Sequence, residues 1–432
     1  MMMSSHDTAT LPPAEEAPLH VEPLQGVSVE THTDSDDMVV NIGPQHPSTH
    51  GVLRLITTLT GERVKHMEPV VGYLHRSKEK MGESRTLFQY QPTIDRVEYL
   101  SSFYDHQVFV NCVEAIAGIP VSRRVNYIRM ITMELNRIAS HLLWFGTFLL
   151  DLGASTPFFW AFRDREEIFT LFEEITGARM MYNYYRFGGV NKDMPPKWME
   201  GVRAFCQRFP ERLKEYEALV NKNPILLDRT IGQGIMTKQF CVDYGVTGPA
   251  LRATGEALDL RKTNPYACYD EVSFDIPVAS ECDTYARYVV RMEEMRESLR
   301  IIEQCLKNMP GGDPLELAAL KAQVEEATKA KKKDPTVVIP DWNSDWDMTG
   351  KKVNLLTFKP PAGEASVFVE SPRGMLGCYM VTDGTPKAYR IKWRGASFSN
   401  LSALPALMEG LLYSDLMAIF GSLDVIMPEV DR

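Results

Sequence analysis

A long helical pattern between Ser122 and Leu150 limits what this chain can fold into more than any other feature. Apolar residues recur there at intervals of three and four, the spacing that places side chains on one face of a helix. We expect an amphipathic helix whose apolar stripe packs against a large core, with its arginines mostly off that stripe. The stripe is Val125, Ile128, Leu135, Ile138, Leu142 and Leu149, and the arginines are Arg123, Arg124, Arg129 and Arg137.

Residues 142–162 continue this pattern as a very apolar stretch, LLWFGTFLLDLGASTPFFWAF. Asp151, Gly153 and Pro157 interrupt it, so no run of about 18 apolar residues occurs and no transmembrane helix is predicted. We expect a buried helix followed by a loop, and the apolar surface could also line a cavity for a hydrophobic ligand. Because a carboxylate is costly to bury alone, Asp151 either ends the helix or has a partner elsewhere.

The other patterns predict an α+β protein, mainly helical, with a central bundle between two small α/β ends. A strand pair is expected over 51–60 and 63–72, and three short strands over 366–370, 378–382 and 388–393. Further helices are expected from Val97 to Cys112 and over 164–176, 197–220, 283–308, 314–333 and 402–420. The predicted division is an acidic disordered tail (1–37), an α/β part (38–72), the helical core (73–308), a divergent helix and linker (309–360) and a C-terminal α/β part (361–432).

Composition excludes several classes of function. The 432 residues carry a formal charge of −10, which argues against a nucleic-acid partner. The seven cysteines include no CxxC pair, so neither a disulfide framework nor a zinc or iron–sulfur site made by this chain alone is expected. No Walker-type phosphate loop occurs. Gly232-Gln233-Gly234 lacks the third glycine of a dinucleotide-binding fingerprint, so the chain is not expected to hold NAD itself.

Two histidines, His46 and His50, lie in the stretch NIGPQHPSTHGVLR, residues 41–54. On a helix, this spacing would place both on one face, as in a metal site. Pro47 disfavours helix at the residue before it, so the pair is predicted to lie in a kinked loop instead. Taken alone, each histidine is expected to hydrogen-bond the loop backbone.

Several stretches together resemble one family. They are GPQHPSTHGVLR (43–54), GYLHR (72–76), DRVEYLS (95–101), ELNRIASHL (134–142), LLDLGASTPFFWAFRDRE (149–166), SPRGMLG (371–377) and SLDVIMPEVDR (422–432). The chain resembles the D subunit, also called the 49-kilodalton-type subunit, of the proton-pumping NADH:quinone oxidoreductase known as respiratory complex I. The resemblance runs from about residue 38 to the C-terminus, with a poor match near 308–360.

This resemblance implies a fold like that of the large subunit of [NiFe] hydrogenases, with the metal site lost. Hydrogenases hold their metal with two CxxC pairs, and this chain has no cysteine in GYLHR or in SLDVIMPEVDR. The family implies that a quinone, the substrate, binds in that space and is reduced to quinol. Electrons come from a [4Fe–4S] cluster on a small partner subunit, and the reaction is coupled to proton translocation. No metal or NAD is expected on this chain.

In the family, the positions matching His50 and Tyr99 donate hydrogen bonds to the two quinone oxygens. Histidine titrates near neutral pH and can supply a proton, whereas tyrosine donates a hydrogen bond without ionising. Asp151 matches the acid that pairs with the histidine, and Thr147 matches a position beside this pair. The resemblance therefore implies catalytic roles for His50, Tyr99 and Asp151, and quinone binding by His50, Tyr99 and Thr147.

Three residues match positions near the partner's cluster. Arg76 and Arg96 match arginines whose charge favours electron arrival, and Met181 stands where the family usually has a histidine. Because methionine does not titrate, we expect the cluster's potential to depend weakly on pH. Ser77, in place of the usual glycine, and Glu98, in place of the usual aspartate, are further departures.

The resemblance also implies partners and a location. The partners are the small [4Fe–4S] subunit (B), the C subunit, the ferredoxin-like subunit (I) and the membrane subunit (H), on the cytoplasmic side of a bacterial inner membrane. The sequence leaves the quinone type and the electron donor open, because related complexes use ferredoxin or other donors. A non-catalytic assembly scaffold is the alternative function.

Overall fold

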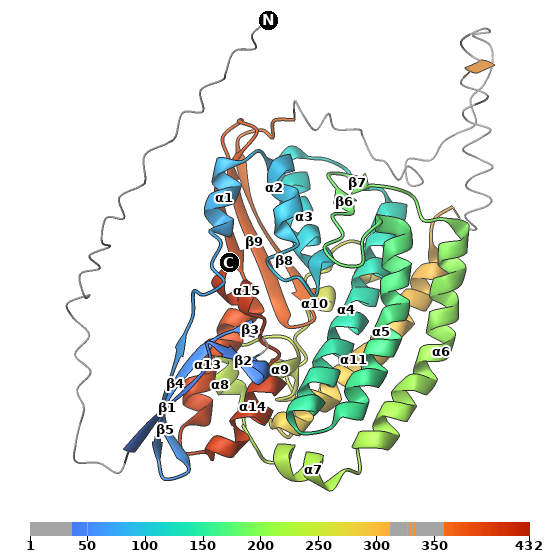
Figure 1. The fold of residues 1–432 in the computed structure, drawn as a ribbon. Helices are drawn as coiled ribbons and strands as arrows, with labels where there is room; N and C mark the ends of the chain where they lie inside the picture. The colour runs from blue at the N-terminus through green and yellow to red at the C-terminus, as the bar shows by residue number, and fades with distance from the viewer. Residues whose placement is uncertain (1–36, 50, 312–325, 327–328, 331, 333–357) are drawn as a thin grey trace, which may run out of the picture. The chain divides into compact units, whose positions relative to one another are not determined.

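The computed structural model describes residues 37–49, 51–311, 326, 329–330, 332 and 358–432. Figure 1 shows their arrangement. The α-helices are α1 (Lys78–Ser84), α2 (Leu87–Ile94), α3 (Ser102–Ala117), α4 (Arg123–Asp151), α5 (Ser155–Thr176), α6 (Pro196–Val220), α7 (Pro224–Thr230), α8 (Lys238–Asp243), α9 (Pro249–Arg252), α10 (Leu260–Thr263), α11 (Thr284–Asn308), α13 (Ala396–Met408), α14 (Leu416–Ser422) and α15 (Met427–Asp431). The strands are β1 (Asp37–Ile42), β2 (Gln45–His46), β3 (Gly51–Val52), β4 (Arg54–Thr60), β5 (Arg63–Val70), β6 (Tyr185–Arg186), β7 (Gly189–Val190), β8 (Gly363–Ser371), β9 (Gly374–Thr382) and β10 (Ala388–Arg394), and short 3₁₀ turns are η1 (Pro47–Thr49), η2 (Tyr269–Glu271) and η4 (Tyr413–Asp415).

Four long helices form the central bundle, in which α4 packs against α5 and α11, and α6 packs against the same two helices (Figure 1). Ser122 caps α4, and its hydroxyl accepts a hydrogen bond from Val125 N at 3.3 Å. Gly177 ends α5 in the left-handed conformation, at φ 79°. The apolar run 142–162 therefore belongs to two helices joined by a short turn at 152–154, whereas a helix and a loop were expected.

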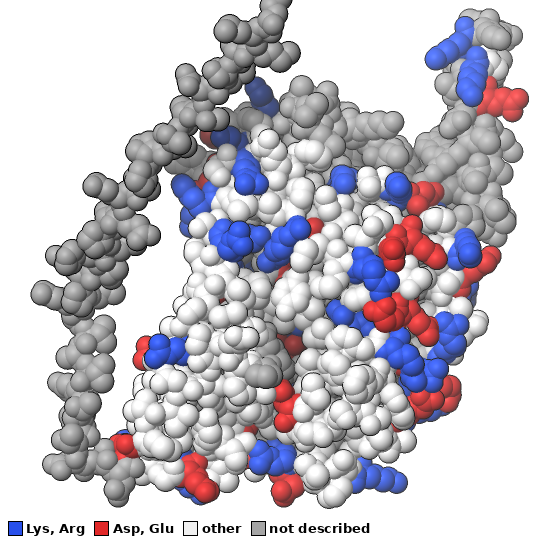
Figure 2. Space-filling model, in the orientation of Figure 1, with Lys and Arg blue, Asp and Glu red and all other residues white. Residues whose placement is uncertain are grey.

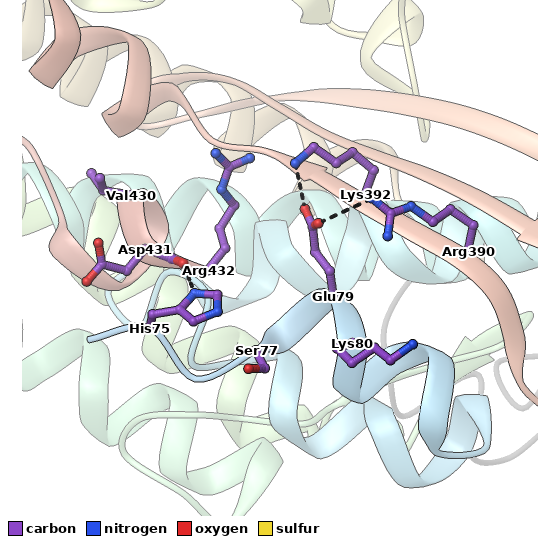
Figure 3. Close-up of a pocket in the computed structure, with 9 residues that line it drawn as sticks. All are labelled: His75, Ser77, Glu79, Lys80, Arg390, Lys392, Val430, Asp431 and Arg432. Atoms are coloured by element: carbon purple, nitrogen blue, oxygen red, sulfur yellow. Dashed lines mark hydrogen bonds and ion pairs between the residues drawn. The ribbon is translucent and has the colours of Figure 1, made fainter. Parts of the chain in front are cut away.

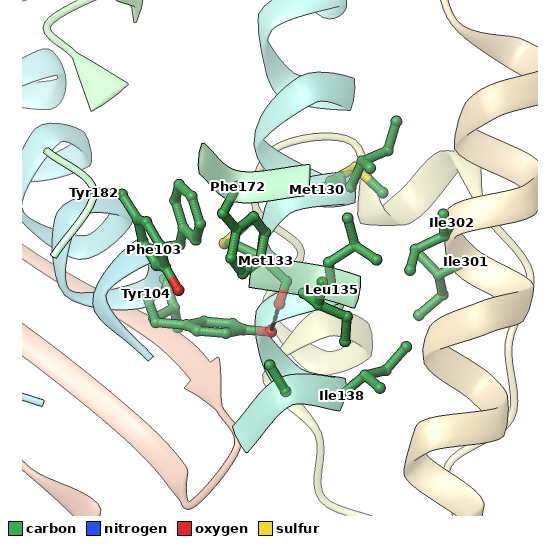
Figure 4. Close-up of a cluster of buried hydrophobic side chains, with 14 of the residues drawn as sticks. Phe103, Tyr104, Met130, Met133, Leu135, Ile138, Phe172, Tyr182, Ile301 and Ile302 are labelled. Atoms are coloured by element: carbon green, nitrogen blue, oxygen red, sulfur yellow. Dashed lines mark hydrogen bonds between the residues drawn. The ribbon is translucent and has the colours of Figure 1, made fainter. Parts of the chain in front are cut away.

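Aromatic and aliphatic side chains from α3, α4, α5 and α11 meet in the core of this bundle (Figure 4). The ring of Phe103 stacks on that of Tyr182 with a centroid distance of 4.3 Å. The Tyr104 hydroxyl donates to the carbonyl oxygen of Met133 at 2.8 Å, so the polar end of this ring is satisfied within the core. The predicted apolar stripe of α4 is buried throughout.

Two antiparallel three-stranded sheets complete an α+β architecture that is mainly helical. Their strand orders are β1-β4-β5 and β10-β9-β8. Leu55, Thr57 and Leu59 point inward from β4, in the alternation that a half-buried strand requires. α13 packs on β5, α3 on β8 and β9, and α1 on β10. The predicted strands in both regions are confirmed, and β8 and β9 are longer than expected.

Two predicted helices were wrong in extent. The helix expected from Val97 begins only at Ser102, because the Asp105 side chain accepts a hydrogen bond from Glu98 N at 2.8 Å and holds the preceding segment in turns. The helix expected over 402–420 is divided between α13 and α14, since the chain between them pairs with β5 through Gly410 N and Val64 O at 2.8 Å. The helix expected over 314–333 falls mostly outside the described residues.

The expectation for the arginines of α4 was also wrong. Arg124, Arg129 and Arg137 are fully buried. Arg129 makes two hydrogen bonds to Glu114, at 2.7 and 3.1 Å, and Arg137 donates to the carbonyl oxygen of Glu370 at 2.7 Å. A guanidinium group can be buried when its donors are paired in this way.

Arg252 lies at the centre of a buried ionic network between α9, α11 and β8. Its guanidinium donates to Glu294 and to Glu370, each at 2.7 Å. His141 Nε2 lies 2.8 Å from the second oxygen of Glu294. Burial opposes ionisation, yet Arg252 and then His141 hold the pKa of Glu294 well below its ordinary value. The interior therefore stores several charges that depend on one another.

No helix in the described part of the chain combines the length and apolarity needed to cross a bilayer.

Replacing Arg252 should reveal this dependence. Arg252→Met is expected to lower the free energy of unfolding by about 3–5 kcal/mol, because Glu294 and Glu370 would remain buried without their shared partner. Denaturant unfolding of the purified chain measures the loss. As a control, Arg208→Met removes an exposed ion pair with Glu167 and should cost about 1 kcal/mol or less. Equal losses would contradict the role given to the network.

Candidate functional site

The stretch around the two histidines forms a small hairpin, in which β2 pairs with β3 on either side of η1. Thr49 is fully buried, and its hydroxyl lies 2.8 Å from the carbonyl oxygen of His46 and 2.9 Å from that of Gly51. His46 Nδ1 accepts a hydrogen bond from Ser48 N at 3.2 Å, which confirms the backbone-fixing role predicted for it. His50 lies outside the described residues.

Thr147 and Asp151 lie in the last two turns of α4, which packs against α14. Thr147 is half-buried, and its hydroxyl donates to the carbonyl oxygen of Leu143 at 3.0 Å. Asp151 is also half-buried and approaches α14 so closely that a Cβ atom added at Gly421 would lie 3.9 Å from its Oδ2. Because η1 packs against α14 as well, the predicted acid and the hairpin meet the same helix.

Tyr99 is held by the turn segment 95–101 between α2 and α3. Asn136 of α4 donates from Nδ2 to the carbonyl oxygen of Leu100 at 2.9 Å and so ties the segment to the bundle. The Tyr99 side chain is half-buried. Burial raises the pKa of its hydroxyl, against a smaller opposite effect of Arg373. The phenol therefore stays protonated at neutral pH and can donate a hydrogen bond.

Arg373 connects this segment to the C-terminal part of the chain. It lies in the two-residue turn between β8 and β9 and is fully buried. Its Nη1 bonds the carboxylate of Glu98 and lies 3.1 Å from Ser140 Oγ, while its Nη2 lies 3.1 Å from Asp424 Oδ1. Glu98, which replaces the usual aspartate, therefore accepts from a buried arginine directly beside Tyr99.

A pocket of about 390 Å³ collects four of the predicted site residues, namely Arg76, Arg96, Tyr99 and Met181. Its remaining lining residues are Leu74, Lys78, Met81, Arg85, Thr93, Pro428 and Arg432. Neither Thr147 nor Asp151 lines it. The pocket is thus built by loops and helix ends that are far apart in the sequence, and we call it the tyrosine pocket.

The tyrosine pocket is strongly cationic. Its lining includes Arg76, Lys78, Arg85, Arg96 and Arg432, and no acidic side chain. Among the described residues, no carboxylate side chain forms an ion pair with any of these cations. Figure 2 shows lysine and arginine side chains gathering over α1 and the C-terminal end of the chain. The positive charge of the pocket is therefore not neutralised within the described chain.

A second pocket of about 340 Å³, which shares Arg432, differs in this respect. Its lysines and arginines are balanced by Glu79, which lies 3.1 Å from Lys392 Nζ and 3.8 Å from Arg390 Nη2 (Figure 3). Paired surface charges of this kind attract a charged ligand less than unpaired ones do. The tyrosine pocket is the better candidate for holding developing negative charge.

Asp431 of α15 positions the loop that carries Arg76. Its carboxylate accepts hydrogen bonds from Gly72 N at 2.8 Å and from Leu74 N at 2.7 Å. Its carbonyl oxygen lies 2.6 Å from His75 Nδ1 (Figure 3). The last helix thus determines the shape of one wall of the tyrosine pocket.

Both unusual residues beside this pocket have left-handed backbone conformations. Ser77 has φ 53° and makes no side-chain cap to α1, and Met181 has φ 60°. Glycine adopts this conformation freely, whereas serine and methionine carry a Cβ atom that disfavours it. The substitutions keep the backbone path at a cost in local strain.

No group of three or more histidine, cysteine, aspartate or glutamate side chains that could hold a metal occurs among the residues the structure describes.

The comparisons with known proteins agree with this arrangement. A family model described as "Respiratory-chain NADH dehydrogenase, 49 Kd subunit" matches residues 151–432. The first of the H subunits of NAD(P)H-quinone oxidoreductase in Gloeobacter violaceus is 47% identical over 401 residues, which cover 93% of this chain and 99% of the relative. The chain belongs to this family.

Other relatives have the same name. The H subunit of Thermosynechococcus vestitus is 47% identical over 406 residues, covering 94% of this chain and 99% of the relative, and the chloroplastic H subunit of Angiopteris evecta is 46% identical over 401 residues, covering 93% and 99%. As a member of the 49-kilodalton family, the chain is part of a NAD(P)H-quinone oxidoreductase complex, and the other subunits of that complex are its partners. The predicted family and enzyme class are confirmed.

Sequence reasoning missed two residues of this family member's site. Lys78 lies two positions beyond the GYLHR stretch, and only its burial distinguishes it from the neighbouring exposed charges. Arg373 belongs to the SPRGMLG stretch, but its partners Glu98 and Asp424 are remote in sequence. The motif around Arg373 was a usable signal, whereas Lys78 offered none.

Ser77 offers a test of the strain beside the pocket. Ser77→Gly is expected to raise the free energy of unfolding by about 1 kcal/mol, because glycine accepts φ 53° without the Cβ clash. Ser402→Gly, on the exposed face of α13, is the control and should lower it by about 0.5 kcal/mol. Denaturant unfolding measures both, and a loss of stability in Ser77→Gly would contradict the strain.

Proposed function

We propose that this protein binds quinone and passes to it electrons from a [4Fe–4S] cluster held by a small partner subunit, in a reaction coupled to proton translocation. The proposed fold is that of the [NiFe]-hydrogenase large subunit, with the quinone headgroup in place of the lost metal. The observation that supports this function best is the tyrosine pocket, where a protonated Tyr99 is surrounded by cations without a carboxylate.

The chemistry of quinone suits such a pocket. A quinone presents two carbonyl oxygens that accept hydrogen bonds, and both oxygens become more negative as electrons arrive. Tyr99 can donate to one of them, since its raised pKa keeps the hydroxyl protonated. Fixed donors and cations placed where negative charge develops stabilise that charge without reorganisation. The bond from Tyr99 strengthens on reduction because its acceptor becomes charged.

We assign the second donor to His50, with Asp151 as its acidic partner and Thr147 beside them. The packing of both η1 and α4 on α14 supports this pairing. A neighbouring carboxylate favours the imidazolium form, so His50 can give a proton to the second quinone oxygen. Asp151 is then less compensated, and we propose this imbalance as the signal to the proton pump.

Arg76 and Arg96 are proposed to face the cluster of the small partner, with Met181 beside it. Their charge favours electron arrival, and the non-titrating Met181 makes the cluster's potential depend weakly on pH. The proposed partners are the small [4Fe–4S] subunit, the C subunit, the ferredoxin-like subunit and the membrane subunit. The proposed location is peripheral, on the cytoplasmic side of a bacterial inner membrane, and ferredoxin is an alternative electron donor.

Tyr99→Phe tests the quinone function directly. In the assembled complex, it is expected to lower kcat for reduction of a soluble quinone by about 100-fold, because the ring remains and the donor is lost. Tyr389→Phe, at an exposed position of β10, is the matched control and should leave the rate unchanged. If the Tyr99→Phe complex assembles and turns over normally, the assembly-scaffold function is favoured instead.

Asp151→Asn tests the coupling. The variant is expected to translocate fewer protons per quinone reduced, because the neutral amide cannot respond to the charge of His50. The ratio is measured with the complex in sealed vesicles. Asp270→Asn, at an exposed position of η2, should leave the ratio unchanged, and an unchanged ratio in Asp151→Asn would refute the proposed signal.

A further inference from the structure

Lys78 is a buried cation that the proposed function does not use. It is the first residue of α1, its side chain lies in the wall of the tyrosine pocket with Tyr99, and only 7% of its surface is exposed. Its Nζ donates to the carbonyl oxygen of Thr93 at 2.8 Å. Among the described residues, no carboxylate lies within ion-pair distance of this ammonium group. Burial of a lysine in this way is rare unless the group is paired.

The charges acting on Lys78 come from every element around it. Burial, followed by Arg96, lowers the pKa of the ammonium group below its ordinary value, and Arg76 acts in the same direction. Asp105 of α3 and Asp95 at the end of α2 oppose this effect. The other charged groups near α1 are Arg85 and Arg432 in the tyrosine pocket, and Glu79, Arg390 and Lys392 in the second pocket. Lys78 therefore holds its proton less firmly than an exposed lysine does.

The composition of the pocket singles out Lys78 further. Its four arginines keep their protons at any working pH, and the leucine, methionine, threonine and proline side chains do not titrate. Lys78 and Tyr99 are therefore the two lining side chains that can exchange protons. Because burial raises the pKa of Tyr99, a phenolate there is unstable and must regain a proton at once.

We propose that Lys78 returns a proton to Tyr99 after Tyr99 has protonated the reduced quinone, an inference that rests on the proposed function. The O–H bond of Tyr99 breaks as its proton moves to the quinone oxygen, which carries the negative charge of electrons delivered by the complex. An N–H bond of the Lys78 ammonium then breaks, and its proton forms a new O–H bond on Tyr99. The neutral amine that remains takes a proton from water at the mouth of the pocket.

This step determines the direction of the pH dependence. It requires the ammonium form of Lys78, so the rate of the unmodified complex falls as the pH rises through the lowered pKa of this group. A lysine with an ordinary pKa would place the same decline at higher pH. Lys78 acts through Tyr99 and is a positioning and proton-supplying residue, without contact to quinone.

Chemical rescue in the assembled complex tests the proposal. Lys78→Ala is expected to lower kcat for quinone reduction by about 100-fold with little change in KM, and to lose the alkaline decline of the rate. Methylammonium or ethylammonium in the assay is expected to restore part of the rate, because the truncated side chain leaves room beside Tyr99. Lys80→Ala, an exposed position of the same helix paired with Glu83, should be unaffected by the substitution and by amines.

Lys78→Arg provides a second measurement that does not depend on assembly of the alanine variant. Arginine keeps the size and charge of the side chain and cannot release a proton, so this variant should also be slow. A full rate in Lys78→Arg would overturn the proposal and leave Lys78 an electrostatic role only. A slow Lys78→Ala complex that no amine restores, or a fast one, would overturn it as well.

Tyr99→Phe in the same assay separates failure of this proposal from failure of the quinone function. If Tyr99→Phe stops quinone reduction and Lys78→Ala does not, the role of Lys78 is refuted and the quinone function stands. If Tyr99→Phe turns over normally, the quinone function itself fails, and the role of Lys78 fails with it.

Discussion

The buried guanidinium of Arg373 is the interaction on which the candidate site depends. It joins the turn between β8 and β9 to the segment that carries Tyr99, to Ser140 of α4 and to Asp424 in the last part of the chain. Without it, Glu98 and Asp424 would be buried carboxylates without a cation, an arrangement that costs several kcal/mol. One side chain therefore connects the bundle, the C-terminal sheet and the turn that positions the phenol.

Charge is distributed in two ways in this protein. In the interior, Arg252, Arg261 and Arg373 are each paired with carboxylates, which holds the pKa of Asp259, for example, at about 2 through Arg261 and Arg252 although burial opposes it. In the tyrosine pocket, the cations have no such partners among the described residues. The interior uses its charges for structure, and the pocket keeps its positive potential for a ligand or a partner.

Sequence periodicity predicted the four bundle helices because their apolar spacing is local information. It failed where a distant group determined the backbone, as at 97–101, where Asn136 holds the turn, and at 409–415, where β5 takes the chain out of the helix. The arginines of α4 were misplaced for the same reason, since Glu370, a partner of Arg137, lies 233 residues away. The family resemblance collected Arg76, Arg96, Tyr99 and Met181, and the pocket that unites them required the structure.

The contact between Asp431 and Gly72 joins residues that are 359 positions apart, so it closes one of the longest loops in the chain. Loop-closure entropy opposes such contacts until shorter-range structure has brought the two segments together. The loop carrying Arg76 is therefore expected to take its final shape late in folding, after the bundle has formed. A partner that recognises the tyrosine pocket thus selects chains whose two distant segments have already met, and so avoids assembling with incompletely folded ones.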